Sequence, residues 1–222
     1  MDLDEFVQAN APEEGAKRFE LENEKLLDID LDGTAMMKAG SMIAYTGNVS
    51  FTGKSSAEGG ISGFLKEKVT NEGTPVMEAE GTGHVYVADQ GKKIQLLHLD
   101  AGEKISVNGN DILAFESQVD YSIGTVSSIS AASSGGLTNV FLEGPGSVAI
   151  TTHGDPLVLT PPVKTDPDAT VAWSGSLSPG ASRNTNLGDM IGQSSDERYQ
   201  LDFSGDEGFV IVQPYEESQP QQ

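Results

Sequence analysis

Short runs of alternating apolar and polar residues, separated by glycines, occupy most of this chain. Between residues 26 and 33, Leu27, Ile29 and Leu31 alternate with three aspartates. This alternation is typical of a β-strand that buries one face and exposes the other. Because comparable runs rich in Val, Ile and Thr recur throughout, the sequence predicts an all-β fold with short strands and frequent turns, as in a sandwich or barrel.

A glycine-containing segment followed by a strand-like run occurs three times, and the copies align on Gly81, Gly144 and Gly205. In each copy two apolar residues follow at alternate positions, namely Val85 and Val87, Val148 and Ile150, and Val210 and Val212. The glycines of the first copy also match part of a phosphate-binding loop, but such a loop needs a helix after it. Because a strand-like run follows instead, we expect tight-turn glycines with positive φ.

Two further patterns repeat with the same period of roughly 60 to 65 residues. An alanine followed by an aromatic residue occurs at Tyr45, Phe115 and Trp173, and an apolar-rich strand precedes each copy. Units of this length bury their inner faces against one another. The sequence therefore predicts three β units around a pseudo-threefold axis with one shared core, at about residues 16–88, 89–153 and 154–214.

The remaining segments predict little regular structure. The acidic N-terminal segment, residues 1–15, contains DLDEFVQ, which forms either a short helix or a disordered arm. Inside the units, one or two helical turns are expected over residues 60–69, and weaker ones over 127–136 and 186–195. Residues 215–222 are polar and are expected to form a disordered tail.

The charge of the chain narrows the classes of partner. The 222 residues include 34 acids and 13 bases, which gives a formal net charge of −21. Nucleic-acid binding relies on Lys and Arg that neutralise phosphates, so this balance argues against it. The acids form either a local docking surface or an adaptation of the whole surface to high salt. Because they are spread along the entire chain, the second explanation is favoured and predicts a halophilic source.

Composition also bears on the cellular compartment. The chain has no cysteine, so neither a disulfide nor a thiolate site can form. No run approaches the roughly 18 apolar residues that a membrane span needs, which leaves only peripheral association with a membrane. The first residues, MDLDEFVQANAPEEGAKRF, are acidic and lack the apolar core of a signal peptide. We therefore expect a cytoplasmic protein.

Two candidate metal sites have simpler structural explanations. The segment DIDLDG at residues 28–33 resembles the start of a calcium loop, but the twelfth position holds Ala39 instead of the required Glu. A half-buried strand explains it better. The three histidines are His84, His98 and His153, and they form no His-x-His pattern. A metal site would therefore require His84 and His98 to converge in space.

Other reactive combinations are also weak. The repeated aromatic residues either line a ligand cage near the axis or anchor the core of equivalent strands, and the second is favoured. Arg183 and Arg198 either bind an anion or pair with surface acids, and the second is again favoured. No Gly-x-Ser-x-Gly nucleophile elbow occurs. The sequence predicts no catalytic residue, no cofactor-binding residue and no metal ligand.

The order of the motifs resembles a known family. Five segments carry the resemblance, in the order GSMIAYTGNVSF, EGTGHVYVADQG, LHLDAGEKISVNGNDILAF, FLEGPGSVAITTHG and FSGDEGFVIVQP. They are similar to the mitochondrial biogenesis family that includes altered inheritance of mitochondria protein 24, over about residues 17–214. The resemblance implies a fold like the subunit of the trp RNA-binding attenuation protein, a short double-stranded β-helix variant, repeated three times. It supplies no catalytic motif.

These observations together predict a non-catalytic scaffold or interaction protein. We expect one β domain over residues 16–214 that needs no cofactor and forms a homo-oligomer or binds a protein partner through its sheet edges. The alternative is a cupin-like protein that binds a small ligand or a metal through His84 or His98. RNA binding by analogy with the attenuation protein is disfavoured, because that relative uses basic residues and this chain is acidic.

Overall fold

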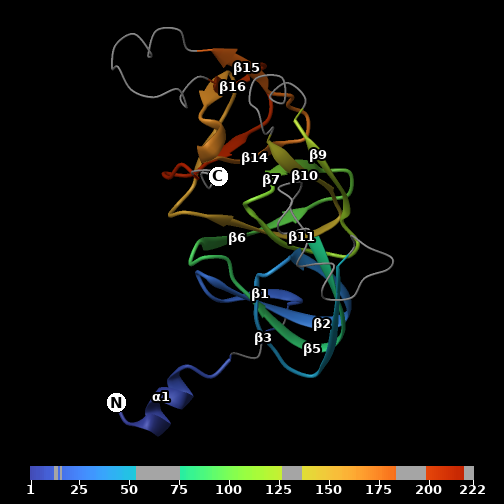
Figure 1. Cartoon of the computed structure of the whole chain (residues 1–222), viewed down its shortest axis with the longest axis vertical. Helices are drawn as coiled ribbons and strands as arrows, with labels where there is room; N and C mark the ends of the chain where they lie inside the picture. Colours follow the sequence, from blue (N-terminus) through green and yellow to red (C-terminus); the bar gives the residue numbers. More distant parts are fainter. Residues whose placement is uncertain (13–14, 16, 54–75, 127–136, 184–198, 218–222) are drawn as a thin grey trace.

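The chain folds almost entirely into β-strands, which confirms the all-β prediction (Figure 1). Among the described residues, the strands form three antiparallel sheets, and the remaining elements are one α-helix, α1 (Leu3–Ala9), and one 3-10 helix, η1 (Pro167–Ala169). The computed structural model describes residues 1–12, 15, 17–53, 76–126, 137–183 and 199–217. The segments expected to form helical turns, 60–69, 127–136 and 186–195, lie outside the described residues.

The helix α1 confirms the helical alternative for the N-terminal segment. Asp2 accepts a hydrogen bond from the amide of Glu5 at 2.8 Å, and Glu5 accepts one from the amide of Asp2 at 3.1 Å. This capping box satisfies two amides that the start of a helix otherwise leaves without partners. The helix buries none of its residues. Neither it nor any other helix in the described part is long and apolar enough to cross a membrane.

The eight-stranded sheet occupies the lower part of Figure 1 and extends to its middle. Its strands follow the order β3-β5-β2-β8-β11-β6, with β1 beside β2 and β4 beside β5. The strand bounds are β1 (Phe19–Asn23), β2 (Leu26–Lys38), β3 (Met42–Tyr45), β4 (Asn48–Gly53), β5 (Val76–Val87), β6 (Lys93–Leu99), β8 (Ile112–Glu116) and β11 (Gly146–Thr152).

Two smaller sheets complete the upper part of the molecule. The six-stranded sheet has the order β12-β17-β14-β7-β10-β9, and the three-stranded sheet has the order β13-β16-β15. Their strands are β7 (Lys104–Asn108), β9 (Asp120–Thr125), β10 (Thr138–Glu143), β12 (Leu157–Leu159), β13 (Val163–Thr165), β14 (Thr170–Ser174), β15 (Gly180–Arg183), β16 (Tyr199–Phe203) and β17 (Val210–Val212).

The same strand pairings recur along the chain. A hairpin-like pair is formed by β4 with β5, by β9 with β10, and by β15 with β16. In each unit, the strand that carries the repeated aromatic residue pairs with the strand residues that follow the repeated glycine. These pairs are β3–β5, β8–β11 and β14–β17. The pairing order thus follows the repeated motifs. A shared threefold axis and a double-stranded β-helix in each unit remain predictions.

Two junctions join neighbouring units by backbone pairing. In the first junction, β2 pairs with β8 and places Met36 opposite Phe115. In the second, β7 pairs with β14 and places Ser106 opposite Trp173. Both junctions are antiparallel and each links three residue pairs. The first unit is therefore joined to the second in the same manner as the second is joined to the third.

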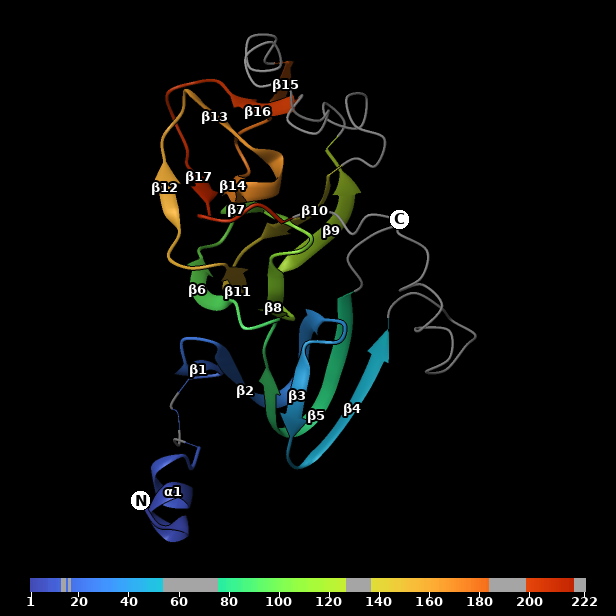
Figure 2. The same ribbon diagram turned by 60° about the vertical axis from the view of Figure 1, so that its left-hand side comes forward.

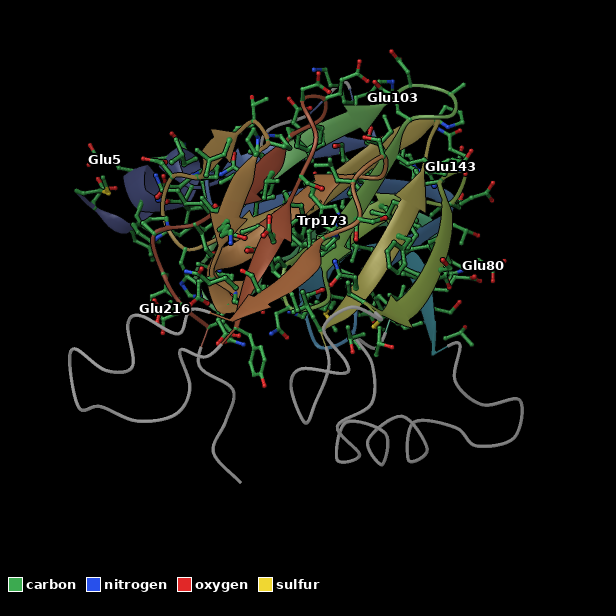
Figure 3. The ribbon with its side chains drawn as sticks, turned by 90° about the horizontal axis from the view of Figure 1, so that it is seen from above. Glu5, Glu80, Glu103, Glu143, Trp173 and Glu216 are labelled. Carbon is green, nitrogen blue, oxygen red and sulfur yellow. The ribbon has the colours of Figure 1, made fainter. Side chains whose placement is uncertain are left out.

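The hydrophobic core consists of three clusters, each made mainly by one unit and completed by residues of a neighbouring unit. Leu27, Ile29 and Leu31 are at most 1% exposed and belong to the cluster of the first unit. Their burial confirms the half-buried strand over residues 26–33 in place of a calcium loop. Phe115 lies in the cluster of the second unit and Trp173 in that of the third. Figure 3 shows Trp173 inside the body of strands.

The glycines of the first repeated motif have a different role from the one predicted. Gly81 and Gly83 have φ of 143° and 139°, so the positive φ is confirmed, but the predicted tight turn is wrong. Both lie within the continuous strand β5. Gly81 lies between β2 and β4, and Gly83 lies between β2 and the turn before β4. A side chain at Gly83 would overlap the carbonyl of Thr46, and one at Gly81 would overlap that of Asn48. The glycines therefore allow close strand contact.

Candidate functional site

A pocket lies on the polar face of β1, β2 and β5. The pairing places Asp28 between Glu20 of β1 and Tyr86 of β5, and places Asp30 opposite His84. Because alternate residues of a strand share a face, Asp28 and Asp30 lie on the side opposite to the buried leucines. The pocket is lined by Gly15, Lys17, Glu20, Leu21, Glu22, Asp28, Asp30 and His84.

Asp28 and His84 form the polar centre of this pocket. The Nδ1 atom of His84 lies 2.9 Å from Oδ2 of Asp28 and 3.1 Å from Oδ1. Burial raises the pKa of Asp28; the hydrogen bond and charge of His84 oppose this rise, and the charges of Asp30 and Glu20 add to it. Tyr86 stacks beside His84, and burial together with the charge of Asp28 raises the pKa of the Tyr86 hydroxyl.

This arrangement can bind a positively charged ligand or exchange a proton. A carboxylate beside Nδ1 fixes the orientation of the imidazole. The neighbouring carboxylates favour positive charge in the pocket. Within the part of the chain that the structure describes, no group of three or more His, Asp or Glu side chains is placed to hold a metal ion.

A buried ion network lies between the units, and sequence analysis did not single out its members. Lys92 Nζ lies 2.9 Å from Oδ1 of Asp111 and also pairs with Oε1 of Glu217. The side chains of Lys92 and Asp111 are 4% and 1% exposed, and that of Glu217 is 14% exposed. Lys92 precedes β6, Asp111 precedes β8 and Glu217 follows β17. The network therefore ties the second unit to the C-terminal end of the third.

Burial and mutual attraction set the protonation of these three groups. Burial, together with the negative charge of Glu217, raises the pKa of Asp111 to about 7. The charge of Lys92 opposes this rise. For Lys92, burial lowers the pKa, but the charge of Asp111 and the hydrogen bond to Glu217 outweigh it and raise the pKa. For Glu217, burial raises the pKa, and the hydrogen bond and charge of Lys92 lower it by more. A charged Lys92–Glu217 pair follows.

A second cation joins the first unit to this network. Lys38 Nζ lies 2.7 Å from Oδ2 of Asp89, and both side chains are less than one-fifth exposed. The same Nζ donates a hydrogen bond of 2.7 Å to the carbonyl of Asn110. That carbonyl also accepts one from Lys92 Nζ at 3.3 Å. Side chains from the end of β2 and from the start of the second unit therefore meet at one backbone carbonyl.

The C-terminal end of the described chain is attached to the same region. The Nε2 atom of His153 lies 3.6 Å from Oε1 of Glu217, and its ring packs against Tyr215 with centroids 4.1 Å apart. The amide of His153 donates to Oε1 of Gln213 at 2.7 Å, and the amide of Glu217 donates to the carbonyl of Asp168 at 3.0 Å. Residues 215–217, within the predicted tail, thus contact the body.

The three histidines lie in three different places. His84 belongs to the pocket, His153 belongs to the ion network, and His98 is exposed on β6 opposite Ser147. In the eight-stranded sheet, β6 is separated from β5 by β2, β8 and β11. The structure therefore does not bring His84 and His98 together in one site.

The other candidate residues also separate. Tyr45 is 48% exposed and contacts Phe51, whereas Phe115 and Trp173 are buried in different clusters. An aromatic cage is therefore wrong, and the core-anchor interpretation is confirmed for Phe115 and Trp173 but not for Tyr45. The side chain of Arg183 and the whole of Arg198 lie outside the described residues.

Little in the sequence pointed to the ion network. Lys92 is one of 13 basic residues in an acidic chain, and Asp111 directly precedes the apolar run ILAF, which is an unusual neighbour for a charge. The partners of Asp111 cannot be named from spacing, because Lys92 and Glu217 belong to distant parts of the chain.

The fold and the site define the class of protein as an all-β protein of recurring antiparallel units. A crystal structure of a Streptococcus pyogenes protein is similar, with a TM-score of 0.68 and 22% sequence identity over 89% of this chain and 92% of that chain. At this identity the likeness shows the fold alone. Residues 19–215 match the family described as Mitochondrial biogenesis AIM24, and the chain belongs to this family. No curated protein sequence matches the chain.

Proposed function

We propose that this protein is a non-catalytic scaffold or interaction protein. The observation that carries the proposal is the buried ion network, in which Lys92 of the second unit pairs with Asp111 and with Glu217, which follows the third unit. Separating a buried ion pair leaves an uncompensated buried charge, so the pairing opposes separation of the elements that carry these residues. A body fixed in this way presents its sheet edges in a constant arrangement, which suits an assembly or docking role.

The distribution of acids supports a protein partner or a second copy over nucleic acid. Figure 3 places Glu80, Glu103, Glu143 and Glu216 around the rim of the molecule, on different strands and loops. With 34 acids against 13 bases, the charge is a property of the whole surface. Such a surface repels phosphates and favours solubility in high salt. A halophilic source and a cytoplasmic location are part of the proposal.

Native mass spectrometry in a volatile high-salt buffer tests this function. We expect a defined oligomer, or a complex with a co-purified protein, whose mass equals the sum of the protein chains. A monomer that carries a stoichiometric metal or small molecule contradicts the proposal. In that case the first variants to examine are those of the pocket around His84.

The pocket favours a second candidate function, the binding of a small cationic ligand. The buried Asp28 beside the half-exposed His84 is the observation that supports it. The variant Asp28→Asn is expected to remove the chemical-shift changes that a cationic amine library causes in β1, β2 and β5, because it removes the buried carboxylate. Asp120→Asn is the matched control, because Asp120 is exposed on β9, outside the pocket. Equal behaviour of the two variants contradicts this function.

The finer architecture is also a proposal. We infer that residues 16–88, 89–153 and 154–214 are three short double-stranded β-helix units related by a pseudo-threefold axis. The recurring pairings β3–β5, β8–β11 and β14–β17 support this description. The two matching junctions between units support it as well.

A further inference from the structure

The three-stranded sheet corresponds to one half of the six-stranded sheet. In the six-stranded sheet, the half β7-β10-β9 of the second unit pairs with the half β14-β17-β12 of the third unit through β7 and β14. The strands β13, β16 and β15 repeat the pairings of β7, β10 and β9 in the third unit. Among the described residues, however, β13 is an edge strand with no strand on its outer side.

The first unit has the complementary half. Its strand β3 is the counterpart of β8 and β14, and like them it pairs with the strand after the repeated glycine. On their other side, β8 and β14 pair with the preceding unit, whereas β3 ends its sheet in the described part of the chain. Figure 2 shows β3 and β13 at opposite ends of the molecule, so they do not pair within one chain.

The side chains of β3 are exposed where those of its counterparts are buried. Ile43 is 62% exposed, and its counterpart Leu113 in β8 is fully buried. Tyr45 is 48% exposed, and its counterpart Phe115 is fully buried. The same apolar positions in β14 are also buried. The sequence of β3 therefore retains the apolar character of a junction strand, while the described part of the chain supplies no junction partner for it.

We infer that β3 of one copy pairs with β13 of a second copy, which rests on the proposed scaffold function. The register follows from the two internal junctions. In the first junction, the residue opposite the repeated aromatic is Met36, two positions before Lys38 at the following turn. In the second junction it is Ser106, two positions before Asn108. The corresponding turn residue after β13 is Asp166. Tyr45 of one copy then lies opposite Lys164 of the next.

The chemistry of the two edges is compatible with this pairing. Lys164 is an exposed cation that already pairs with Asp202 at 3.2 Å, and its stem can lie against the ring of Tyr45. The contact is head to tail, so each copy has a donor edge and an acceptor edge, and the assembly is a ring or a filament. Completion of the pair turns the three-stranded sheet into a continuous sheet across two copies.

The net charge of −21 makes the association depend on salt. Like-charged copies repel one another when the Debye length is long, about 30 Å at 0.01 M, and much less when it is about 3 Å at 1 M salt. We expect the population of oligomers to rise with salt concentration in sedimentation velocity. The absence of cysteine makes covalent trapping of the junction straightforward.

Disulfide trapping tests the register directly. The variants Tyr45→Cys and Lys164→Cys are purified separately, mixed at about 1 M salt and oxidised. Facing positions of paired strands bring their Cβ atoms within reach of a disulfide, so the mixture is expected to yield cross-linked dimers much faster than either variant alone. A control mixture pairs Tyr45→Cys with Ser122→Cys, an exposed position on β9. Equal rates in the two mixtures overturn the pairing.

A charge substitution provides a second test. We expect Ile43→Glu to weaken self-association about tenfold or more, because it places a carboxylate at the junction. Ile123→Glu, at another exposed isoleucine on β9, is expected to change it less than about twofold. If the wild-type oligomer survives Ile43→Glu unchanged, the β3–β13 pairing is overturned and the scaffold function stands. A ligand-carrying monomer instead overturns the scaffold function itself.

Discussion

Replacement of Lys92 by methionine provides the sharpest test of the buried ion network. The substitution keeps most of the apolar stem of the side chain and removes the ammonium group, with its charge and its hydrogen bonds. It leaves Asp111, which is 1% exposed, without the cation 2.9 Å away. It also removes the lysine partner of Glu217. The expected result is a large loss of folding stability, because an unpaired carboxylate is then buried.

The size of the loss follows from burial. Breaking a buried ion pair by removing one partner typically costs about 3–5 kcal/mol, whereas an exposed pair contributes about 0–1 kcal/mol. The matched control is Lys164→Met, which removes the pair with Asp202 whose side chains are 54% and 38% exposed. We expect the free energies of unfolding of the two variants to differ by at least about 2 kcal/mol at pH 8.

The loss should also depend on pH in a defined direction. The folded-state pKa of Asp111 is about 7, well above the ordinary value of an aspartate, so ionisation of Asp111 costs stability as pH rises from about 4 to 7. Without Lys92 this pKa rises further. At pH 5 Asp111 is protonated in both proteins, and at pH 8 only the wild type has the ion pair. Lys92→Met should therefore cost less at pH 5 than at pH 8.

Urea denaturation followed by tryptophan fluorescence and circular dichroism at both pH values measures these quantities. Trp173, the single tryptophan, is buried in the third unit and reports the transition there. A cost below about 1 kcal/mol at pH 8, or the same cost for Lys92→Met and Lys164→Met, refutes the reasoning. It would show that the network is weakly coupled to folding.

Three further outcomes follow from the described contacts. Gly83→Ala should cost about 1–3 kcal/mol in urea denaturation, because φ is 139° and the carbonyl of Thr46 is in the way, whereas Gly124→Ala should change stability by less than about 0.5 kcal/mol. Phe115→Ala should lower the free energy of unfolding by about 3–5 kcal/mol, and a smaller loss contradicts full burial. His84→Gln should raise the pKa of Asp28 further in a carboxyl NMR titration, since the opposing charge is removed; a lowered pKa contradicts the pairing.

Part of the fold could be predicted from local sequence because its cause is local. The alternation of Leu27, Ile29 and Leu31 with aspartates places one face of a strand in the core, whatever its partners are. The repeated motifs likewise indicated recurring strands and the family. The burial of Phe115 and Trp173 followed from the same pattern. Tyr45 did not follow it, because the burial of that position depends on a neighbouring strand that the described chain does not supply.

The glycine motif shows where local reasoning reached its limit. The sequence indicated that Gly81 and Gly83 have positive φ, since only glycine adopts it without strain. It could not distinguish a tight turn from a bend within a long strand. That difference is decided by the closeness of the backbone of Thr46 and Asn48, which is a contact between strands.

Composition and periodicity by themselves determined the all-β class, the repeated order of strands and the acidic balance of charge, and the order of the motifs carried the resemblance to the family. Tertiary structure alone decided that Lys92, Asp111 and Glu217 meet, that Asp28 is buried beside His84, and that the histidines lie apart. The physical reason is that strand alternation depends on neighbours two residues away. Ion pairing and edge pairing depend on residues that the chain brings together only after the sheets have formed.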